Sequence, residues 1–261
     1  MSNTAPAPSS SSRRRPDYGL DAPGVVRNLL FAGAVGLLAV AARVAGVWHE
    51  RMRAAVVLMP LMFAGLAMGL TGLLMVWHSR IGKVRERERH LDRLPWRGDE
   101  TVLDVGCGRG LFLVGAAKRL DNGGKAVGVD LWRAEDLAGN SPDATLANAR
   151  LEGVADRVEV KTADARQLPF PDGTFDAVVS RAALHNIYRA DERAKAVAEI
   201  ARVLKPGGRV LIVDIRHTGE YAETLRRHGV ADAAARRGIS SWLATAITFG
   251  ALRIGVVTGR K

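Results

Sequence analysis

Residues 102–110 (VLDVGCGRG) constrain the fold of this chain more than any other segment. A short valine-rich and leucine-rich run that carries an acid is typical of a buried strand, and glycines at 106, 108 and 110 allow a tight turn with close approach to a ligand. Residues 111–120 are compatible with a helix, so the order strand, turn, helix indicates a nucleotide-binding turn of an α/β fold. The sixth position of the dinucleotide fingerprint is Leu111 instead of glycine, which argues against a pyrophosphate site. A purely structural turn remains the alternative.

Four later segments, in a fixed order, accompany this turn. They are AVGVDL at 126–131, TADARQLPF at 162–170, FDAVVS at 175–180 and LKPGGRVLIVD at 204–214. With these motifs, over roughly residues 90–261, the chain resembles the class I S-adenosylmethionine-dependent methyltransferases, in particular the branch that includes the ubiquinone and menaquinone C-methyltransferases. The resemblance implies an α/β fold with a Rossmann-like, seven-stranded sheet that ends in an antiparallel carboxyl-terminal hairpin, and S-adenosyl-L-methionine as cofactor.

The resemblance also assigns roles to single residues. It implies that Asp104 and the glycine turn hold the methionine part of the cofactor, that Asp130 binds both ribose hydroxyls and that Leu131 packs on the adenine. Asp164, with the backbone of Ala165, would read the adenine amino edge. A carboxylate at the end of a strand suits a diol because it accepts two charge-assisted hydrogen bonds, although an aspartate there is also a common cap or turn former. The predicted cofactor-binding set is Asp104, Gly106, Cys107, Gly108, Gly110, Asp130, Leu131, Asp164, Ala165 and Ser180.

Two residues of the turn distinguish this chain from its apparent relatives. Arg109 stands where many of them carry a small Thr or Ser, and we expect its side chain to point to solvent. Cys107 is the single cysteine, which excludes an internal disulfide and a multi-thiolate metal site and predicts a small buried side chain. One cysteine also argues against the arsenic methyltransferases that resemble this branch, because those enzymes hold the metalloid with several.

The sequence of the amino-terminal third predicts a hairpin of two transmembrane helices. Residues 29–47 carry one charge, Arg43, and residues 54–77 carry none. About 20 apolar residues cross a bilayer core, so we predict two transmembrane helices within residues 28–77, joined by a turn at 49–53. Residues 65–69 (GLAMG) offer a small-residue face for close helix packing. A buried core helix and a cleaved signal peptide are the alternatives, and the long polar tail in front of the first apolar run speaks against the second.

Charge places the membrane segment relative to the cytosol. Residues 1–97 carry a net charge of +8 out of the total of +11, concentrated before the first apolar run and after the second. The positive-inside tendency therefore predicts a multi-pass protein of the cytoplasmic membrane, with its amino terminus and catalytic domain in the cytosol, and basic residues near anionic headgroups. We interpret residues 1–27 as a disordered basic tail and residues 78–97 as an amphipathic linker helix that leaves the membrane and covers the cofactor pocket. A solvated helix with alternating charges is the alternative for 85–89.

Residues 98–261 are long enough for one α/β domain. Apolar runs near 101, 126, 157, 175 and 209 alternate with helix-compatible stretches, which predicts a parallel sheet. Residues 251–257 are the best final strand of the carboxyl-terminal hairpin. A third membrane span over 239–257 is the alternative, and Gly250, Arg253 and Gly255 argue against it.

The acceptor side of the reaction is less constrained. The segment after the fourth predicted strand contains His185, a candidate general base or acceptor contact, and Arg181, a candidate for orienting an anionic or carbonyl acceptor; a structural hydrogen bond is the alternative for His185. Tyr188 and Tyr221 are weaker candidates for lining the pocket.

The motifs also restrict the class of acceptor. No Asn-Pro-Pro-aromatic element and no Pro-Cys nucleophile follow that strand, which disfavours a nucleic acid. A membrane anchor favours a small, lipid-soluble acceptor. A non-catalytic cofactor-binding membrane protein and a nicotinamide-dependent oxidoreductase are the rival interpretations.

Overall fold

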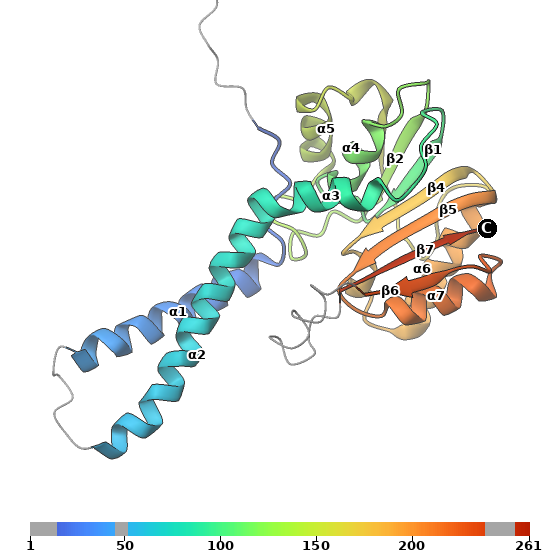
Figure 1. Ribbon diagram of the computed structural model, residues 1–261. Coiled ribbons are helices and arrows are strands. Elements are labelled where there is room, and N and C mark those ends of the chain that lie inside the picture. Colours follow the sequence, from blue (N-terminus) through green and yellow to red (C-terminus); the bar gives the residue numbers. More distant parts are fainter. Residues whose placement is uncertain (1–14, 45–51, 238–253) are drawn as a thin grey trace, which may run out of the picture.

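The computed structural model describes residues 15–44, 52–237 and 254–261. It shows an α/β domain from which a long helical hairpin projects (Figure 1). The domain is built on a seven-stranded sheet with the order β3-β2-β1-β4-β5-β7-β6, in which β1 to β5 are parallel and β7 is antiparallel to both of its neighbours. The strands are β1 (Thr101–Val105), β2 (Lys125–Asp130), β3 (Val158–Thr162), β4 (Phe175–Arg181), β5 (Leu204–Asp214), β6 (Ala234–Arg236) and β7 (Gly255–Arg260). The five parallel strands predicted from the sequence are confirmed.

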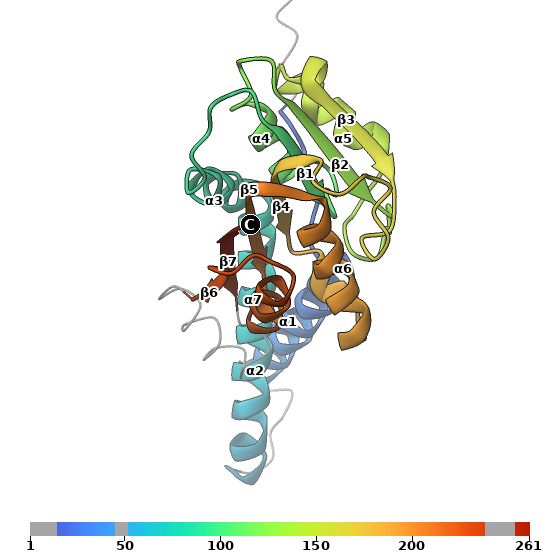
Figure 2. The same cartoon turned by 90° about the vertical axis from the view of Figure 1, so that its right-hand side faces the viewer.

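Helices cover both faces of the sheet (Figure 2). On one face lie α3 (Lys83–Leu91), α4 (Leu111–Ala117) and α5 (Pro142–Leu151), and on the other lie α6 (Ala190–Val203) and α7 (Thr218–Arg227). Three short helical turns complete the description: η1 (His78–Gly82), η2 (Ala155–Arg157) and η3 (Leu184–Asn186).

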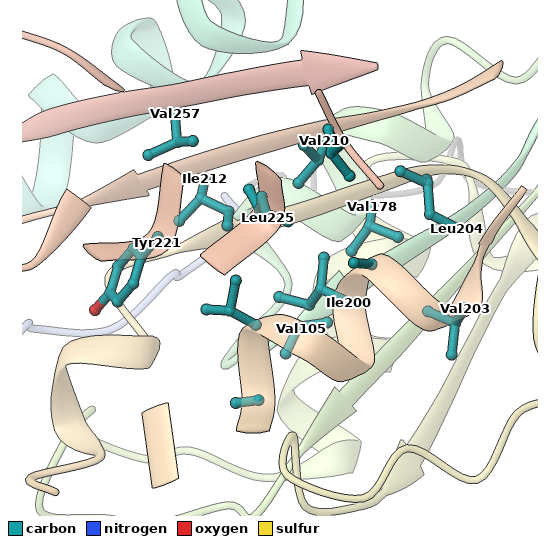
Figure 3. Packing of buried hydrophobic residues seen from close by; sticks show 14 of the residues in the cluster. Val105, Val178, Ile200, Val203, Leu204, Val210, Ile212, Tyr221, Leu225 and Val257 are labelled. Atoms are coloured by element: carbon teal, nitrogen blue, oxygen red, sulfur yellow. The ribbon is translucent and has the colours of Figure 1, made fainter. Parts of the chain in front are cut away.

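The period-2 alternation of the strands sorts side chains between these two layers. In β1, Val102 packs in the cluster under α4, whereas Leu103 and Val105 pack in the cluster under α6. Figure 3 shows the second cluster, in which Ile200 of α6 and Leu225 of α7 lie over the strands. Both faces are thus buried, as the near-continuous apolar strands require.

The strand order also places the ligand-binding edge of the sheet. From β1 the chain proceeds outward to β2 and β3, and then returns to the other side of β1 at β4. The crevice outside the carboxyl ends of β1 and β4 is therefore the topological switch point, where open α/β sheets bind their ligands.

The carboxyl-terminal strands partly match the prediction. An antiparallel pair, β6 and β7, ends the sheet, and β7 pairs with β5 from Gly255 onward. The predicted final strand, 251–257, therefore begins later and runs to Arg260, because the pairing register with β5 extends to Arg209. Residues 251–253, like most of the alternative third span at 239–257, lie outside the described residues.

The projecting hairpin consists of α1 (Pro23–Val44) and α2 (Met52–Trp77), which pack against each other along glycines. A Cβ added to Gly36 would lie 2.9 Å from Gly65 Cα, and one added to Gly33 would lie still closer to Gly69 Cα. The small-residue face predicted at 65–69 is thus a packing face. Of the turn predicted at 49–53, Met52 and Arg53 belong to α2, and residues 49–51 lie outside the described residues.

The sequence predicted two membrane-spanning helices, and the described residues contain one candidate. Of the helical residues that the structure describes, Met62–Leu91 is long and apolar enough to cross a bilayer, and Pro23–Ala39 is an apolar helix below that length.

The segments that flank the hairpin differ from the predictions. Residues 15–22, here called the amino-terminal strap, are packed against the α/β domain: Tyr18 is 5% exposed and its hydroxyl donates to Glu152 Oε1 at 2.7 Å. The disordered tail predicted for 1–27 is therefore wrong from residue 15 onward, because an aromatic side chain and backbone polar groups find partners on the domain; residues 1–14 are not described. The linker helix predicted for 78–97 ends at Leu91 and begins with the π-helical turn η1, which continues α2.

Two basic residues of α3 do not face anionic headgroups, contrary to the prediction from the sequence. Lys83 and Arg87 are both 2% exposed and are bound by the strap and by Glu88 and Glu152, so they do not face headgroups. The exposed basic residues near the hairpin are Arg80, Arg85, Arg89 and Arg93.

Candidate active site

The glycine turn lies at the carboxyl end of β1 and needs its glycines. Gly106, Gly108 and Gly110 have φ of 72°, 53° and 86°, a left-handed region that other residues adopt at a cost. Gly106 N donates to Val129 O at 2.8 Å, which ties the turn to β2. Gly110 precedes the first residue of α4, so the turn delivers the chain directly into a helix, as predicted.

Asp130, the last residue of β2, lies directly beside this turn. Its carboxylate accepts from Gly108 N at 2.8 Å and from Trp132 N at 2.7 Å, and the second bond holds the Trp132 backbone at φ 58°. Asn140 Nδ2 donates to the same carboxylate at 3.2 Å. Leu131, next to it, is 44% exposed. A carboxylate and an exposed apolar side chain at the switch point match the roles that the family resemblance implies for a ribose and an adenine.

Asp104 is buried in the helix layer of α4. It is 1% exposed, and among the described residues neither carboxylate oxygen has a hydrogen-bond partner. Burial raises the pKa of Asp104 to about 8, and the nearby charge of Asp130 acts in the same direction. An unpartnered buried carboxyl beside a glycine turn suits a cationic ligand.

Cys107 and Ser180 support the turn from inside the domain. Cys107 is buried against Gly128, where an added Cβ would lie 2.7 Å from its sulfur, and burial raises the pKa of the thiol. Ser180 is 1% exposed, and its hydroxyl donates to Val105 O at 2.7 Å, which joins the ends of β4 and β1. The structure gives both side chains a packing role next to the predicted cofactor site.

Asp164 follows β3 and is held by a neighbouring arginine. Arg166 Nε donates to Asp164 Oδ1 at 2.9 Å, and this hydrogen bond is the main reason that the pKa of Asp164 is lowered. Ala163 N donates to Asp130 O at 3.2 Å, so the loop with Asp164 and Ala165 borders the end of β2.

His185 has a buried carboxylate as its partner. Its Nδ1 lies 2.6 Å from Asp214 Oδ1, and its backbone N donates to Asp214 Oδ2 at 3.1 Å. Tyr221, predicted to line the pocket, is buried and donates to the same carboxylate at 3.3 Å, and desolvation raises its pKa. Asp214 was not assigned a role from the sequence, although it ends an apolar strand just as Asp130 does. Tyr188, the other tyrosine candidate, is 91% exposed.

Arg181 is paired within the protein. Its guanidinium lies 3.3 Å from Glu86 of α3 and 3.9 Å from Asp21 of the strap. The arginine that ends β4 thus connects the carboxyl end of this strand to the base of the hairpin, and its Nε has no hydrogen-bond partner among the described residues.

Arg109 does not point to solvent, contrary to the sequence-based expectation. Its side chain bonds to Asp17 of the strap, to O at 2.8 Å and to Oδ2 at 2.9 Å, and to Ala138 O at 3.2 Å. The sequence offered no signal for this contact, because the partners are 92 and 29 residues away.

A cavity lies at the opposite edge of the sheet. This cavity of about 230 Å³ is bordered by Trp96, Lys205 and Arg209, near the amino ends of the parallel strands. It is far from the switch point and contains none of the predicted site residues, so we do not assign the cofactor to it.

The residues at the switch point fit S-adenosylmethionine. The glycine turn leaves the backbone open to a ligand, Asp130 offers a carboxylate for a diol, and Asp104 is a buried acid without a hydrogen-bond partner in the described part of the chain. Within the described ranges no group of three metal-ligating side chains occurs.

Comparisons with known proteins agree with this assignment. Residues 103–212 match the family model described as a methyltransferase domain. The chain is 35% identical over 126 residues to a sterol 4-C-methyltransferase of Caenorhabditis elegans, covering 48% of this chain and 34% of that protein. It is 33% identical over 130 residues to a demethylmenaquinone methyltransferase of Lactiplantibacillus plantarum, covering 49% and 50%. This chain therefore spans half or less of the length of these two curated relatives.

A solved structure shares the fold. The geranyl diphosphate C-methyltransferase of Streptomyces coelicolor superposes with a TM-score of 0.51 at 19% identity, covering 67% of this chain and 78% of that one. The family match thus places a methyltransferase domain over residues 103–212, the solved structure shares its fold, and S-adenosyl-L-methionine is the cofactor that these relatives and the residues at the switch point support.

Proposed function

We propose that this protein is a membrane-anchored methyltransferase that transfers the methyl group of S-adenosylmethionine to a small, lipid-soluble acceptor. The observation that carries the proposal is the position of the site relative to the hairpin. The carboxyl ends of β4 and β5 point toward the base of the hairpin in Figure 1, and the pair Glu86–Arg181 joins the two at 3.3 Å.

The surface of the hairpin supports the membrane part of the proposal. A helix that is apolar on all sides belongs inside a protein or a bilayer, and large exposed apolar patches are rare on soluble monomers. Among the side chains that the structure describes on α1, α2 and η1, the large apolar ones that are exposed are Val25, Phe31, Val35, Leu37, Leu38, Met59, Phe63, Leu66, Met68, Leu70, Leu73, Leu74, Trp77 and Ile81. At 1.5 Å per residue, the 26 residues of α2 extend about 39 Å, enough for a bilayer core of about 30 Å, whereas the apolar part of α1, Pro23–Ala39, extends about 25 Å and needs its flanking residues to reach across.

The exposed arginines support a cytosolic position of the domain in the cytoplasmic membrane. Arg15 and Arg27 lie near the start of α1, and Arg80, Arg85, Arg89 and Arg93 follow α2. Both groups are at the domain end of the hairpin, as the positive-inside tendency requires for two spans with cytosolic ends.

The cofactor supplies a methyl group activated by its sulfonium. The chain supplies binding and orientation: the glycine turn and Asp104 for the methionine part, Asp130 for the ribose, and Leu131 and Asp164 for the adenine. Asp214 orients the His185 imidazole through Nδ1, which leaves Nε2 to accept a proton from an acceptor hydroxyl or acidic carbon. The names of the two curated relatives, a sterol and a demethylmenaquinone methyltransferase, support a small, lipid-soluble acceptor.

The test is a transfer assay with the full chain in mild detergent. The protein is incubated with methyl-labelled S-adenosylmethionine and either membrane or soluble extract, and products are separated by solvent extraction. The proposal predicts label in the solvent-extractable fraction, and much less label with Asp130→Asn protein at a cofactor concentration well below saturation. Label confined to water-soluble products would refute the lipid acceptor. Cofactor binding without any labelled product would favour a non-catalytic protein.

Membrane insertion is tested separately by alkaline extraction of cell membranes. A spanning hairpin keeps the protein in the membrane pellet, whereas release into the supernatant would refute the anchor. A nucleic-acid acceptor would be recognised by label in extracted RNA or DNA.

A further inference from the structure

The amino-terminal strap crosses the outside of the glycine turn. Asn148 of α5 is buried between them: it accepts from Asp17 N at 2.9 Å and donates to Asp17 O at 2.8 Å and Arg109 O at 2.9 Å. Arg109 adds two bonds to Asp17 from the turn itself. The strap and the turn are therefore joined by the buried Asn148 amide, whose loss would leave backbone groups of Asp17 and Arg109 unpaired, and by the solvent-exposed ion pair of Arg109 with Asp17.

A lysine of α3 holds the strap from the opposite side. Lys83 Nζ donates to Tyr18 O at 2.8 Å and to Gly19 O at 2.6 Å, with its side chain 2% exposed. Arg87, one turn later, donates to the Tyr18 hydroxyl at 2.9 Å. A buried lysine that is used on two backbone carbonyls is costly unless the strap stays in place.

The strap in turn pairs with the segment between β2 and α5, residues 131–140, here called the cover loop. Ala138 N donates to Leu20 O and Ala22 N donates to Asp136 O, each at 3.3 Å, which makes an antiparallel bridge of Asp21 with Leu137. Arg109 also reaches the cover loop at Ala138 O.

The cover loop lies over the cofactor-binding residues. Leu137 is so close to Gly108 that a Cβ on this glycine would lie 2.9 Å from Leu137 Cδ2. At the end of the loop, Asn140 donates to Asp130 at 3.2 Å. The loop thus contacts both the turn assigned to the methionine part and the acid assigned to the ribose.

We propose that the strap is part of the cofactor site, with Arg109 and Lys83 as positioning residues that hold the cover loop over Asp130 and Gly108, and that the cofactor enters and leaves when the loop separates from the strap. The inference rests on the proposed placement of the cofactor at Asp130. Both helices of the hairpin are connected to these contacts through the chain. The helix α1 begins at Pro23 immediately after the strap, and α2 continues through η1 into α3, which carries Lys83.

The first experiment measures release of labelled S-adenosylhomocysteine from the detergent-solubilised full chain after an unlabelled chase. The contacts of Arg109 and Lys83 with the strap are here called the clamp. Arg109→Ala and Lys83→Met each remove the charged donor of these hydrogen bonds, which should accelerate release of S-adenosylhomocysteine about tenfold or more. Arg150→Ala, an exposed arginine on α5, is the matched control and should release at the wild-type rate. The split between KM for S-adenosylmethionine, which should rise, and kcat at saturation, which should not fall, separates a positioning role from general loss of structure.

The second experiment uses one folded protein in two states. The hydrogen bonds flank Asp21 and Leu137, so these residues form the non-hydrogen-bonded pair of the bridge, with a Cα separation of about 4.5 Å that accepts a disulfide. In Asp21→Cys/Leu137→Cys protein, oxidation should slow release about tenfold, and reduction should restore it; the native Cys107 is buried.

Release rates within twofold of wild type in Arg109→Ala and Lys83→Met, or equal release from the oxidised and reduced double-cysteine protein, would overturn the inference. Asp130→Asn separates this failure from a wrong cofactor placement. If Asp130→Asn protein binds S-adenosylhomocysteine with wild-type affinity, the cofactor placement is wrong. If Asp130→Asn weakens binding but Arg109→Ala and Lys83→Met leave the release rate unchanged, only the role of the strap is refuted.

Discussion

The buried carboxyl of Asp104 should make the cofactor-free protein less stable as the pH rises. Its pKa is raised from 3.8 to about 8 in the folded protein because burial disfavours the charged form. Between these two values the folded state holds a proton that the unfolded state has lost. The stability contributed by this proton is therefore fully present below about pH 4 and disappears as the pH approaches 8.

Asp104→Asn keeps the shape of the protonated acid and cannot ionise. One pKa unit corresponds to about 1.4 kcal/mol, so wild type should lose about 3–4 kcal/mol relative to the variant between pH 5 and pH 8. Because the unfolded acid is already ionised at pH 5, the variant should be the more stable by about 1.5 kcal/mol at that pH. At pH 8 the variant should be the more stable by about 5 kcal/mol.

The assay is urea unfolding of the cofactor-free full chain in a non-ionic detergent, followed by tryptophan fluorescence at four pH values and constant ionic strength. The other ionisable groups are common to both proteins, so their contributions cancel in the difference. Asp156→Asn, which changes an exposed acid, should show no pH-dependent difference from wild type. A wild-type minus Asp104→Asn difference that stays constant from pH 5 to pH 8 would refute the reasoning, and so would a variant less stable than wild type at pH 8.

Three further outcomes follow from the described contacts. Asp130→Asn should weaken S-adenosylhomocysteine binding about 10- to 100-fold in calorimetry, because a carboxylate contributes about 1.5–3 kcal/mol through charged hydrogen bonds; unchanged affinity would remove Asp130 from the site. His185→Gln should lower kcat about 10²- to 10⁴-fold with normal cofactor affinity, and Asp214→Asn should shift the pH profile of kcat, since it changes the partner of Nδ1; a wild-type pH profile in Asp214→Asn would contradict the dyad. Gly36→Ala should destabilise the hairpin by about 1–3 kcal/mol because its Cβ would meet Gly65 Cα, whereas Gly24→Ala, with open space around it, should not. Equal thermal unfolding temperatures for the two alanine variants would argue against the observed packing of α1 on α2.

The sequence by itself determined the α/β class, the five parallel strands and the glycine turn. These features are local: the valine-rich runs have to be buried on both sides, and Gly106, Gly108 and Gly110 take left-handed backbone angles that other residues adopt at a cost. The position of Asp130 at the end of β2 followed in the same way. Asp214 carries the same signal at the end of β5 and could have been found by the same argument.

Only the tertiary structure decided what the charged side chains do. From the sequence we expected Arg109 to face solvent, Lys83 to face headgroups and Arg181 to face the acceptor. In the structure each of these side chains binds partners that are far away in the sequence. Hydropathy patterns report which side chains avoid water, but they carry no information about which carbonyl or carboxylate a buried cation meets. That choice depends on how the strap, α3 and the glycine turn come together in space, because buried charges are tolerated only where distant segments supply their hydrogen-bond partners.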